Sequence, residues 1–119
     1  MRQERFTEQA QEALAASQEV VRKYHHAQWD VEHILLALLQ QESGLVPELL
    51  KELAGDVDEV KRRVDAALEK VPKVAYEGTQ IYATPRVAAL LENASGEADR
   101  LKDEFIGTEH LFIAIVGER

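Results

Sequence analysis

Apolar residues recur at three- and four-residue steps along most of the chain, which is the spacing of helices that bury one face. The first such segment spans residues 7–23, and Thr7 is its candidate N-cap because a threonine hydroxyl can accept a hydrogen bond from a first-turn amide. Residues 25–29 form a short connection anchored by Trp29. The stripe predicted to face the core comprises Phe6, Ala10, Ala13, Leu14, Ser17, Val21 and Tyr24.

Three more helices are predicted in the first half of the chain. Asp30 is a good cap for a second helix, in which residues 34–39 are apolar on every side, as in the middle of a bundle. A third helix carries Pro47 in its first turn and ends near residues 54–55. The apolar spacing predicts a fourth helix over about residues 56–70.

A linker and two further helices complete the chain. Residues 72–83 break the helical spacing and predict the linker. Thr84 is expected to cap a fifth helix with Pro85 at its first helical position, and a sixth helix starts at Gly107 or Thr108. The predicted buried side of the fifth helix comprises Val87, Leu90, Leu91, Ala94, Ala98 and Leu101.

The chain contains an internal repeat, because residues 7–39 align with residues 84–116 without a gap at an offset of 77 positions. We therefore predict an all-α fold, a compact helical bundle of two repeated units related by a pseudo-two-fold axis. Repeat one covers about residues 6–71 and repeat two about residues 84–119. Repeat two ends after its second helix, so either the chain is a fragment or this half lacks the matching helix pair. The identical pairs are Thr7/Thr84, Leu14/Leu91, Glu32/Glu109, His33/His110 and Ala37/Ala114.

The composition excludes several classes of function. The 119 residues suit one domain, and the net charge of −8 argues against a nucleic-acid-binding face or attraction to an anionic membrane, since both need a basic surface. The chain has no cysteine, so disulfides and thiol chemistry are excluded. No apolar run approaches the roughly 20 residues that span a bilayer, and the start of the chain lacks a signal-peptide stretch. We expect a cytoplasmic protein that binds neither nucleic acid nor membrane.

Motifs for catalysis are missing from the sequence. None of the six glycines is followed by lysine, so the chain lacks the phosphate-binding loop of an ATPase, and the histidines show no metal-ligand spacing. We therefore expect a protein that is not an enzyme and holds no metal or cofactor. His33 and His110 are expected to be partly buried and bonded to the opposite half, because buried polar groups normally find partners.

Four segments carry a resemblance to a known family: residues 5–10 (RFTEQA), 32–38 (EHILLAL), 84–86 (TPR) and 101–111 (LKDEFIGTEHL). Together they resemble the Clp N-terminal domain, the double-repeat helical module at the front of ClpB- and ClpC-type AAA+ chaperones. The resemblance implies a mobile, non-catalytic appendage on a hexameric ring that binds ATP and Mg²⁺ through downstream modules. Its partners would be unfolded or aggregated client proteins or adaptors, and the isolated domain would be a monomer. Family members usually have two further helices after the position of Arg119.

Two equivalent polar sets are candidate binding sites, Thr7 with Glu32 and Thr84 with Glu109. A helix start with free amides and a hydroxyl suits an anion, and a nearby carboxylate suits a guanidinium group. Together these groups would accept an arginine-like ligand, and in the ClpC branch the resemblance implies phospho-arginine at this place. The simpler alternative is that the threonines cap helices and the glutamates complement helix dipoles.

The resemblance to the ClpB branch implies a further set of substrate-binding residues. Residues matching Thr7, Asp103 and Glu109 are linked to substrate handling there, although Asp103 could also lie in a solvated turn. Leu14 and Leu91 are the apolar candidates, with Ala10, Val87 and Leu111 as neighbours. They are either core residues or line a groove, between the first and sixth helices or between the helices equivalent to them in the repeat, that binds exposed apolar segments. A stand-alone helical interaction protein remains the third alternative.

Overall fold

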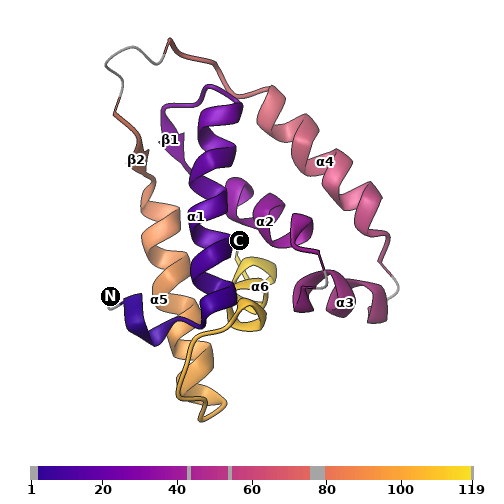
Figure 1. The fold of residues 1–119 in the computed structure, drawn as a ribbon, viewed down its shortest axis with the longest axis vertical. Coiled ribbons are helices and arrows are strands. Elements are labelled where there is room, and N and C mark those ends of the chain that lie inside the picture. The colour runs from indigo at the N-terminus through magenta and orange to yellow at the C-terminus, as the bar shows by residue number, and fades with distance from the viewer. Residues whose placement is uncertain (1–2, 43, 54, 76–79, 119) are drawn as a thin grey trace.

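The computed structural model describes residues 3–42, 44–53, 55–75 and 80–118. Within these ranges the chain forms six α-helices, which confirms the predicted all-α fold class (Figure 1). A short 3₁₀ turn at Gln3–Arg5 precedes them, and two strands of two residues each, β1 (Gln28–Trp29) and β2 (Tyr82–Ala83), lie before α2 and α5. The helices are α1 (Glu8–Lys23), α2 (Val31–Gln40), α3 (Leu45–Glu52), α4 (Val57–Glu69), α5 (Pro85–Arg100) and α6 (Thr108–Val116).

The starts of α1 and α2 follow the capping predicted from the sequence. The hydroxyl of Thr7 accepts a hydrogen bond from the amide of Ala10 at 3.1 Å, and the carboxylate of Asp30 accepts from the amide of Val31 at 2.8 Å. Asp56 caps α4 in the same way. These bonds satisfy amides that would otherwise lack a partner in the first turn.

The predicted cap of the fifth helix is wrong in its chemistry. Thr84 stands at the N-cap position of α5, but its hydroxyl donates to Asp30 at 2.9 Å and makes no side-chain bond to a first-turn amide. A carboxylate is a stronger acceptor for a hydroxyl than a neutral group, so Asp30 draws the Thr84 hydroxyl across to the other half. The helix α3 ends at Glu52, close to the predicted end at residues 54–55. Ala54, in this predicted helix end, and Gly78, in the predicted linker, lie outside the described residues.

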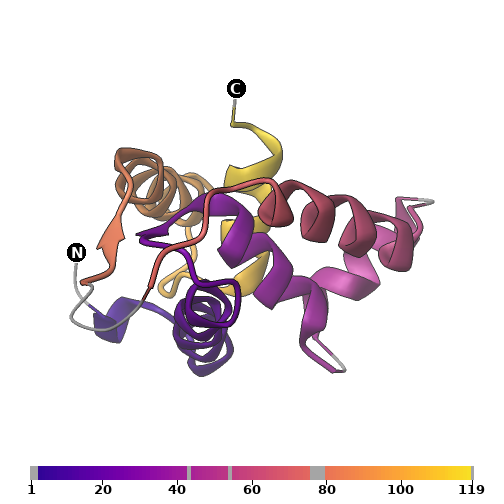
Figure 2. The ribbon, with the colours of Figure 1, turned by 90° about the horizontal axis from the view of Figure 1, so that it is seen from above.

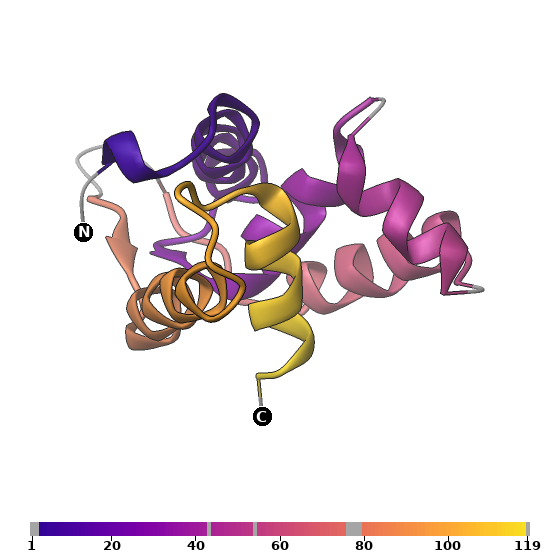
Figure 3. The ribbon, with the colours of Figure 1, turned by 90° about the horizontal axis from the view of Figure 1, so that it is seen from below.

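The helices pack as two pairs whose second members meet in the centre. The helix α1 packs on α2, α5 packs on α6, and α2 contacts α6. Figures 2 and 3 show α1 and α5 nearly end-on, flanking the central pair, while α3 and α4 extend the first half on one side. None of the helices in the described ranges is long and apolar enough to cross a membrane.

Two reciprocal backbone pairings join the halves. The strands β1 and β2 pair in parallel, with Trp29 opposite Ala83, and an isolated bridge places Phe6 opposite Ile106. An offset of 77 exchanges one pairing for the other, as the pseudo-two-fold requires. Part of the predicted linker therefore forms β2, which the sequence pattern did not reveal because two residues are too few to show alternation.

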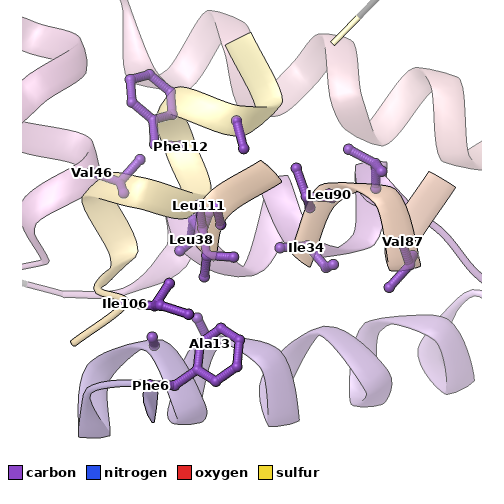
Figure 4. Packing of buried hydrophobic residues seen from close by; sticks show 14 of the residues in the cluster. Phe6, Ala13, Ile34, Leu38, Val46, Val87, Leu90, Ile106, Leu111 and Phe112 are labelled. Atoms are coloured by element: carbon purple, nitrogen blue, oxygen red, sulfur yellow. The ribbon is translucent and has the colours of Figure 1, made fainter. Parts of the chain in front are cut away.

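The shared core lies between the two pairs of helices (Figure 4). Ile34 and Leu38 from α2 and Leu111 from α6 are completely buried there, so the apolar run around Leu38 packs in the middle as predicted. The other fully or almost fully buried members include Ala10, Ala13, Val87, Leu90, Ala94, Ala98 and Ile106.

The prediction that Leu101 is buried is wrong, since this side chain is 45% exposed. Its counterpart in the first half, Tyr24, is only 8% exposed because it packs against Val64 and Leu68 of α4. Among the described residues no helix covers the α5–α6 pair as α4 covers α1–α2. Val116 is consequently 67% exposed, whereas its counterpart Leu39 is buried.

Replacing Leu38 by alanine should lower the free energy of unfolding by about 2–5 kcal/mol, because it removes a fully buried side chain from the shared core. Leu53→Ala is the matched control, since Leu53 is 71% exposed and its loss should cost less than about 0.5 kcal/mol. Urea denaturation followed by circular dichroism measures both values. Equal stability of the two variants would contradict the described core.

Candidate functional site

A buried histidine closes the first turn of α2. The amide of Asp30 donates to Nδ1 of His33 at 2.9 Å, so in the neutral ring the proton is on Nε2, which meets Nδ1 of His26 at 2.8 Å. His26 follows His25, whose backbone has a positive φ of 57°, so the ring is presented by the tight turn after α1. The predicted bond of His33 to the opposite half is therefore wrong, and the side chain is buried rather than partly buried, at 2% exposure.

The same arrangement recurs at the start of α6. The amide of Gly107 donates to Nδ1 of His110 at 2.8 Å, and Nε2 of His110 donates to the carboxylate of Asp103 at 2.8 Å. Lys102, at the position of His25, also has a positive φ, of 60°. His110 thus bonds within its own half as well, again against prediction. Asp103 and His26 differ in chemistry but orient the histidine of their own half in the same way.

The two paired rings in the first half have lowered pKa values. Burial lowers the pKa of His26, and burial followed by repulsion from His26 lowers the pKa of His33. The positive charge of a protonated ring would be poorly solvated in this position. Both rings are therefore neutral at neutral pH.

The structure exchanges the partners of the two predicted sets, because Thr84 lies with Asp30 and Glu32, and Thr7 lies at the start of α6 with Glu109. The corner of Glu32 and Thr84 already holds a guanidinium group. Arg86 from α5 donates to Asp30 at 3.3 Å and to Glu32 at 3.2 Å, and its Nε donates to Glu118 at 3.0 Å. The bonds to Glu118 and then Glu32 raise the pKa of Arg86, so the guanidinium stays charged. Thr84 joins the corner through Asp30. A cavity of about 210 Å³ opens beside Arg86 and Glu32.

The Thr7–Glu109 set forms the equivalent corner, but without an arginine. At the offset of 77, Gly107 replaces Asp30, and Gln9 and Gln41 replace Arg86 and Glu118. Gln41 donates to the backbone oxygen of Gln9 at 3.0 Å, so the contact between these positions survives in neutral form. The Glu109 carboxylate lies over Gly107, where an added Cβ would be only 2.0 Å from its Oε1. Glu109 thus occupies the space that a side chain at position 107 would need.

An apolar groove lies between α1, α5 and β1. The cavity has a volume of about 350 Å³, and Leu14 from α1 and Leu91 from α5 both line it. The structure therefore places these two predicted residues together, although the groove runs beside α5 and not beside α6. Their neighbours Ala10, Val87 and Leu111 are buried in the core. The full lining is Phe6, Gln11, Leu14, Ala15, Gln18, Trp29 and Leu91.

A larger hollow, of about 560 Å³, lies between the adjoining ends of α2, α3 and α4. Lys51, Lys61, Asp56 and Asp58 are among its lining residues, so charges of both signs face it. An apolar ligand would desolvate these charges at a high energetic cost. The smaller groove is the better candidate for an apolar ligand.

Sequence reasoning missed three residues of these sites. It treated Trp29 only as an anchor, and it assigned no role to Phe6 in the groove or to Arg86 in the corner. The offset of 77 offered a signal, because it aligns Trp29 with Ile106 and Arg86 with Gln9. At each of these two aligned pairs, the side chains of the two halves differ in size or charge.

Comparison with known proteins identifies relatives along almost the whole chain. A family profile described as the Clp repeat (R) N-terminal domain matches residues 5–119. The chaperone protein ClpB of Nitratidesulfovibrio vulgaris is 36% identical over 117 residues, which cover 96% of this chain and 14% of that protein. The chain thus spans a small part of this relative.

Solved structures show the same fold. The Hsp104 N-terminal domain from Candida albicans superposes with a TM-score of 0.84 at 20% identity, covering 94% of this chain and 73% of that chain. The N-terminal domain of the ClpV1 ATPase from E. coli gives a TM-score of 0.83 at 25% identity, with 94% and 68% coverage.

The histidine pair predicts a loss of stability in mild acid. Folding lowers both pKa values below the unfolded value of about 6.5, so the unfolded chain binds protons first as the pH falls. The stabilisation is complete above about pH 6.5 and is lost as the pH falls through the folded pKa values. Urea unfolding between about pH 7.5 and pH 5.5 should show this decrease.

A matched control for this titration is His25→Asn, which removes an exposed histidine at a position where asparagine tolerates a positive φ. It retains both His26 and His33, so the decrease in stability between about pH 7.5 and pH 5.5 should remain. NMR titration of the ring protons should place the pKa values of His26 and His33 below that of an unfolded histidine. Values at or above 6.5 would contradict the described burial.

Proposed function

The chain belongs to the Clp repeat N-terminal domain family, and we propose that it is a non-catalytic recognition module of a Clp-type, ATP-dependent protein disaggregase or unfoldase in the cytoplasm. The relatives that support this proposal are called chaperone protein ClpB, and the chain covers only 14% of the one compared above. The proposal places ATP and Mg²⁺ in other modules of a hexameric ring. The isolated domain would act as a monomer.

The apolar groove carries this proposal. Unfolded and aggregated proteins expose apolar side chains, and burying one such side chain contributes about 1.5–3 kcal/mol. A groove of about 350 Å³ has room for few such anchors. Association costs several kcal/mol in lost freedom, so binding should be weak and reversible. Such affinity suits a domain that passes clients onward.

The polar residues implicated by the family resemblance have structural neighbours that fit a supporting role. Thr7 directly follows Phe6, which lines the groove. The backbone amide of Thr7 donates to the backbone oxygen of Ile106 at 2.9 Å. Asp103 and Glu109 both lie beside His110 at the start of α6. We expect Asp103 to act mainly by orienting His110. Glu109 remains the residue of this group best placed to meet a cationic partner.

A second candidate function is the docking of phospho-arginine or of an arginine-bearing adaptor. The observation that favours it is that Asp30, Glu32 and Glu118 already hold the guanidinium of Arg86. At the equivalent corner of Thr7 and Glu109, Gln9 stands at the position of Arg86. The Asp30 carboxylate would repel a phosphate at the first corner, so we expect a single ligand, at Glu109.

A stand-alone helical interaction protein is the third candidate. The gene sequence after residue 119 discriminates it from the others. A phosphate-binding loop ending in Gly-Lys-Thr or Gly-Lys-Ser there would support the ATPase connection. A stop codon directly after this position would favour the stand-alone protein.

Leu14→Ser and Leu91→Ser should each weaken the binding of an unfolded, apolar polypeptide by about tenfold, because each removes roughly 1.4 kcal/mol or more of apolar contact. The measurement is an NMR titration with reduced, alkylated α-lactalbumin, which also locates the binding surface from shifted amide signals. Leu53→Ser, which changes an exposed leucine on another face, should bind like the original chain. Unchanged signals along the groove would rule out the proposed client site.

Calorimetry with free phospho-arginine tests the second candidate. We expect one ligand per chain, loss of binding in Glu109→Gln, and little change in Glu32→Gln, because the first corner is filled by Arg86. The two substitutions are matched by the repeat and remove the same charge. Two bound ligands, or equal effects of the two changes, would contradict the assignment to one corner.

A further inference from the structure

The identity of the groove residues indicates what kind of side chain the groove prefers. We propose that Trp29 makes it selective for an aromatic side chain within an uncharged, extended segment of the bound polypeptide. This inference rests on the proposed function of the groove in binding client segments.

Trp29 is a fixed wall of the groove. Its indole Nε1 donates to the hydroxyl of Ser17 at 2.8 Å, and that hydroxyl donates to the backbone oxygen of Leu14 at 2.6 Å. Ser17 is completely buried, so the hydrogen bond anchors the indole from inside α1. A ring held in one orientation loses little freedom when a ligand packs against it.

The repeat indicates that a residue this large is not needed for the fold at this position. The equivalent residue is Ile106, which is completely buried in the shared core. Both residues support the same kind of backbone pairing, Trp29 with Ala83 and Ile106 with Phe6. Trp29, in contrast, is only partly buried and lines the cavity. The extra aromatic surface is therefore available to a ligand.

The charge of the lining restricts the ligand. All seven residues around the groove are uncharged, in a chain with a net charge of −8. A charged side chain entering the groove would lose water and find no opposite charge among the lining residues. Gln18 is exposed and lines the groove, so its amide can bond to the backbone of a bound segment. The occupant that fits is an uncharged polypeptide segment.

The volume sets the number of side chains that enter. About 350 Å³ is somewhat more than twice the roughly 150 Å³ of an apolar cavity that holds one benzene molecule. One or two large side chains therefore fit. An extended segment presents residues i and i+2 on the same face, about 6.6 Å apart, so two side chains of one segment can enter the groove together. Ring packing against Trp29 favours an aromatic anchor over an aliphatic one by about two- to tenfold.

Two uncharged ten-residue peptides that differ only in a central Phe or Leu test the proposal with the intact chain. The Phe peptide should bind about two- to tenfold more tightly. Trp29→Ile, which installs the residue of the equivalent position, should abolish this preference, so that the Phe and Leu peptides bind this variant with equal affinity. Trp29 is the single tryptophan of the chain, so its fluorescence reports contact directly. The Phe peptide should shift its emission to the blue and protect it from acrylamide quenching.

Ser17→Ala provides a second variant that keeps the indole and removes its anchor, and it should reduce the preference for Phe. Thermal unfolding checks that both variants fold. If Trp29→Ile does not fold, the peptide preference of Ser17→Ala and the acrylamide quenching of Trp29 in the original chain test the proposal. If both peptides bind equally and quenching is unchanged, the role of Trp29 is overturned while the groove remains a binding site. If neither peptide binds, the proposed function of the groove fails as well.

Discussion

Two reciprocal backbone hydrogen bonds hold the halves of this domain in register. The amide of Thr7 donates to Ile106, and the amide of Thr84 donates to Trp29, both at 2.9 Å. Each bond ties the segment before the first helix of one half to the segment before the second helix of the other. The pairing sets the two halves so that Leu14 of α1 and Leu91 of α5 line one groove. It also places Thr84 within reach of Asp30.

The symmetry of the backbone is not kept by the side chains, and the differences indicate where the halves have separate roles. At the start of α2, the charged corner of Asp30 and Glu32 is closed by Arg86 from the second half, and α4 covers the outer face of the first half. At the start of α6, Gln9 from the first half takes the place of this arginine. Leu101, Ile113 and Val116 are exposed on α5–α6. The groove lies on the boundary, where Trp29 gives it a wall that a second isoleucine would not provide.

Much of the fold could be predicted because it follows from local signals. Capping residues such as Thr7 and Asp30, helical spacing and the offset of 77 predicted the helices and the central packing of Leu38. The predicted burial of Leu101 was wrong because burial depends on which element covers a surface, whereas the spacing of apolar residues indicates only which face of a helix is apolar. The predicted bonding partner of His33 was wrong because a short turn with a positive φ brings His26 to this ring. The spacing of apolar residues carries no information about such a turn.

The candidate site was predictable only in part, because leucines in a groove and in a core share the same spacing. The central claim is that the groove between α1 and α5, and not the exposed α5–α6 face, binds unfolded polypeptide. Photo-crosslinking from an unfolded client with diazirine-bearing leucines, mapped by mass spectrometry, compares the two apolar surfaces directly. We predict crosslinks to Phe6, Leu14, Trp29 and Leu91, whereas crosslinks concentrated at Leu101, Ile113 and Val116 would contradict this account.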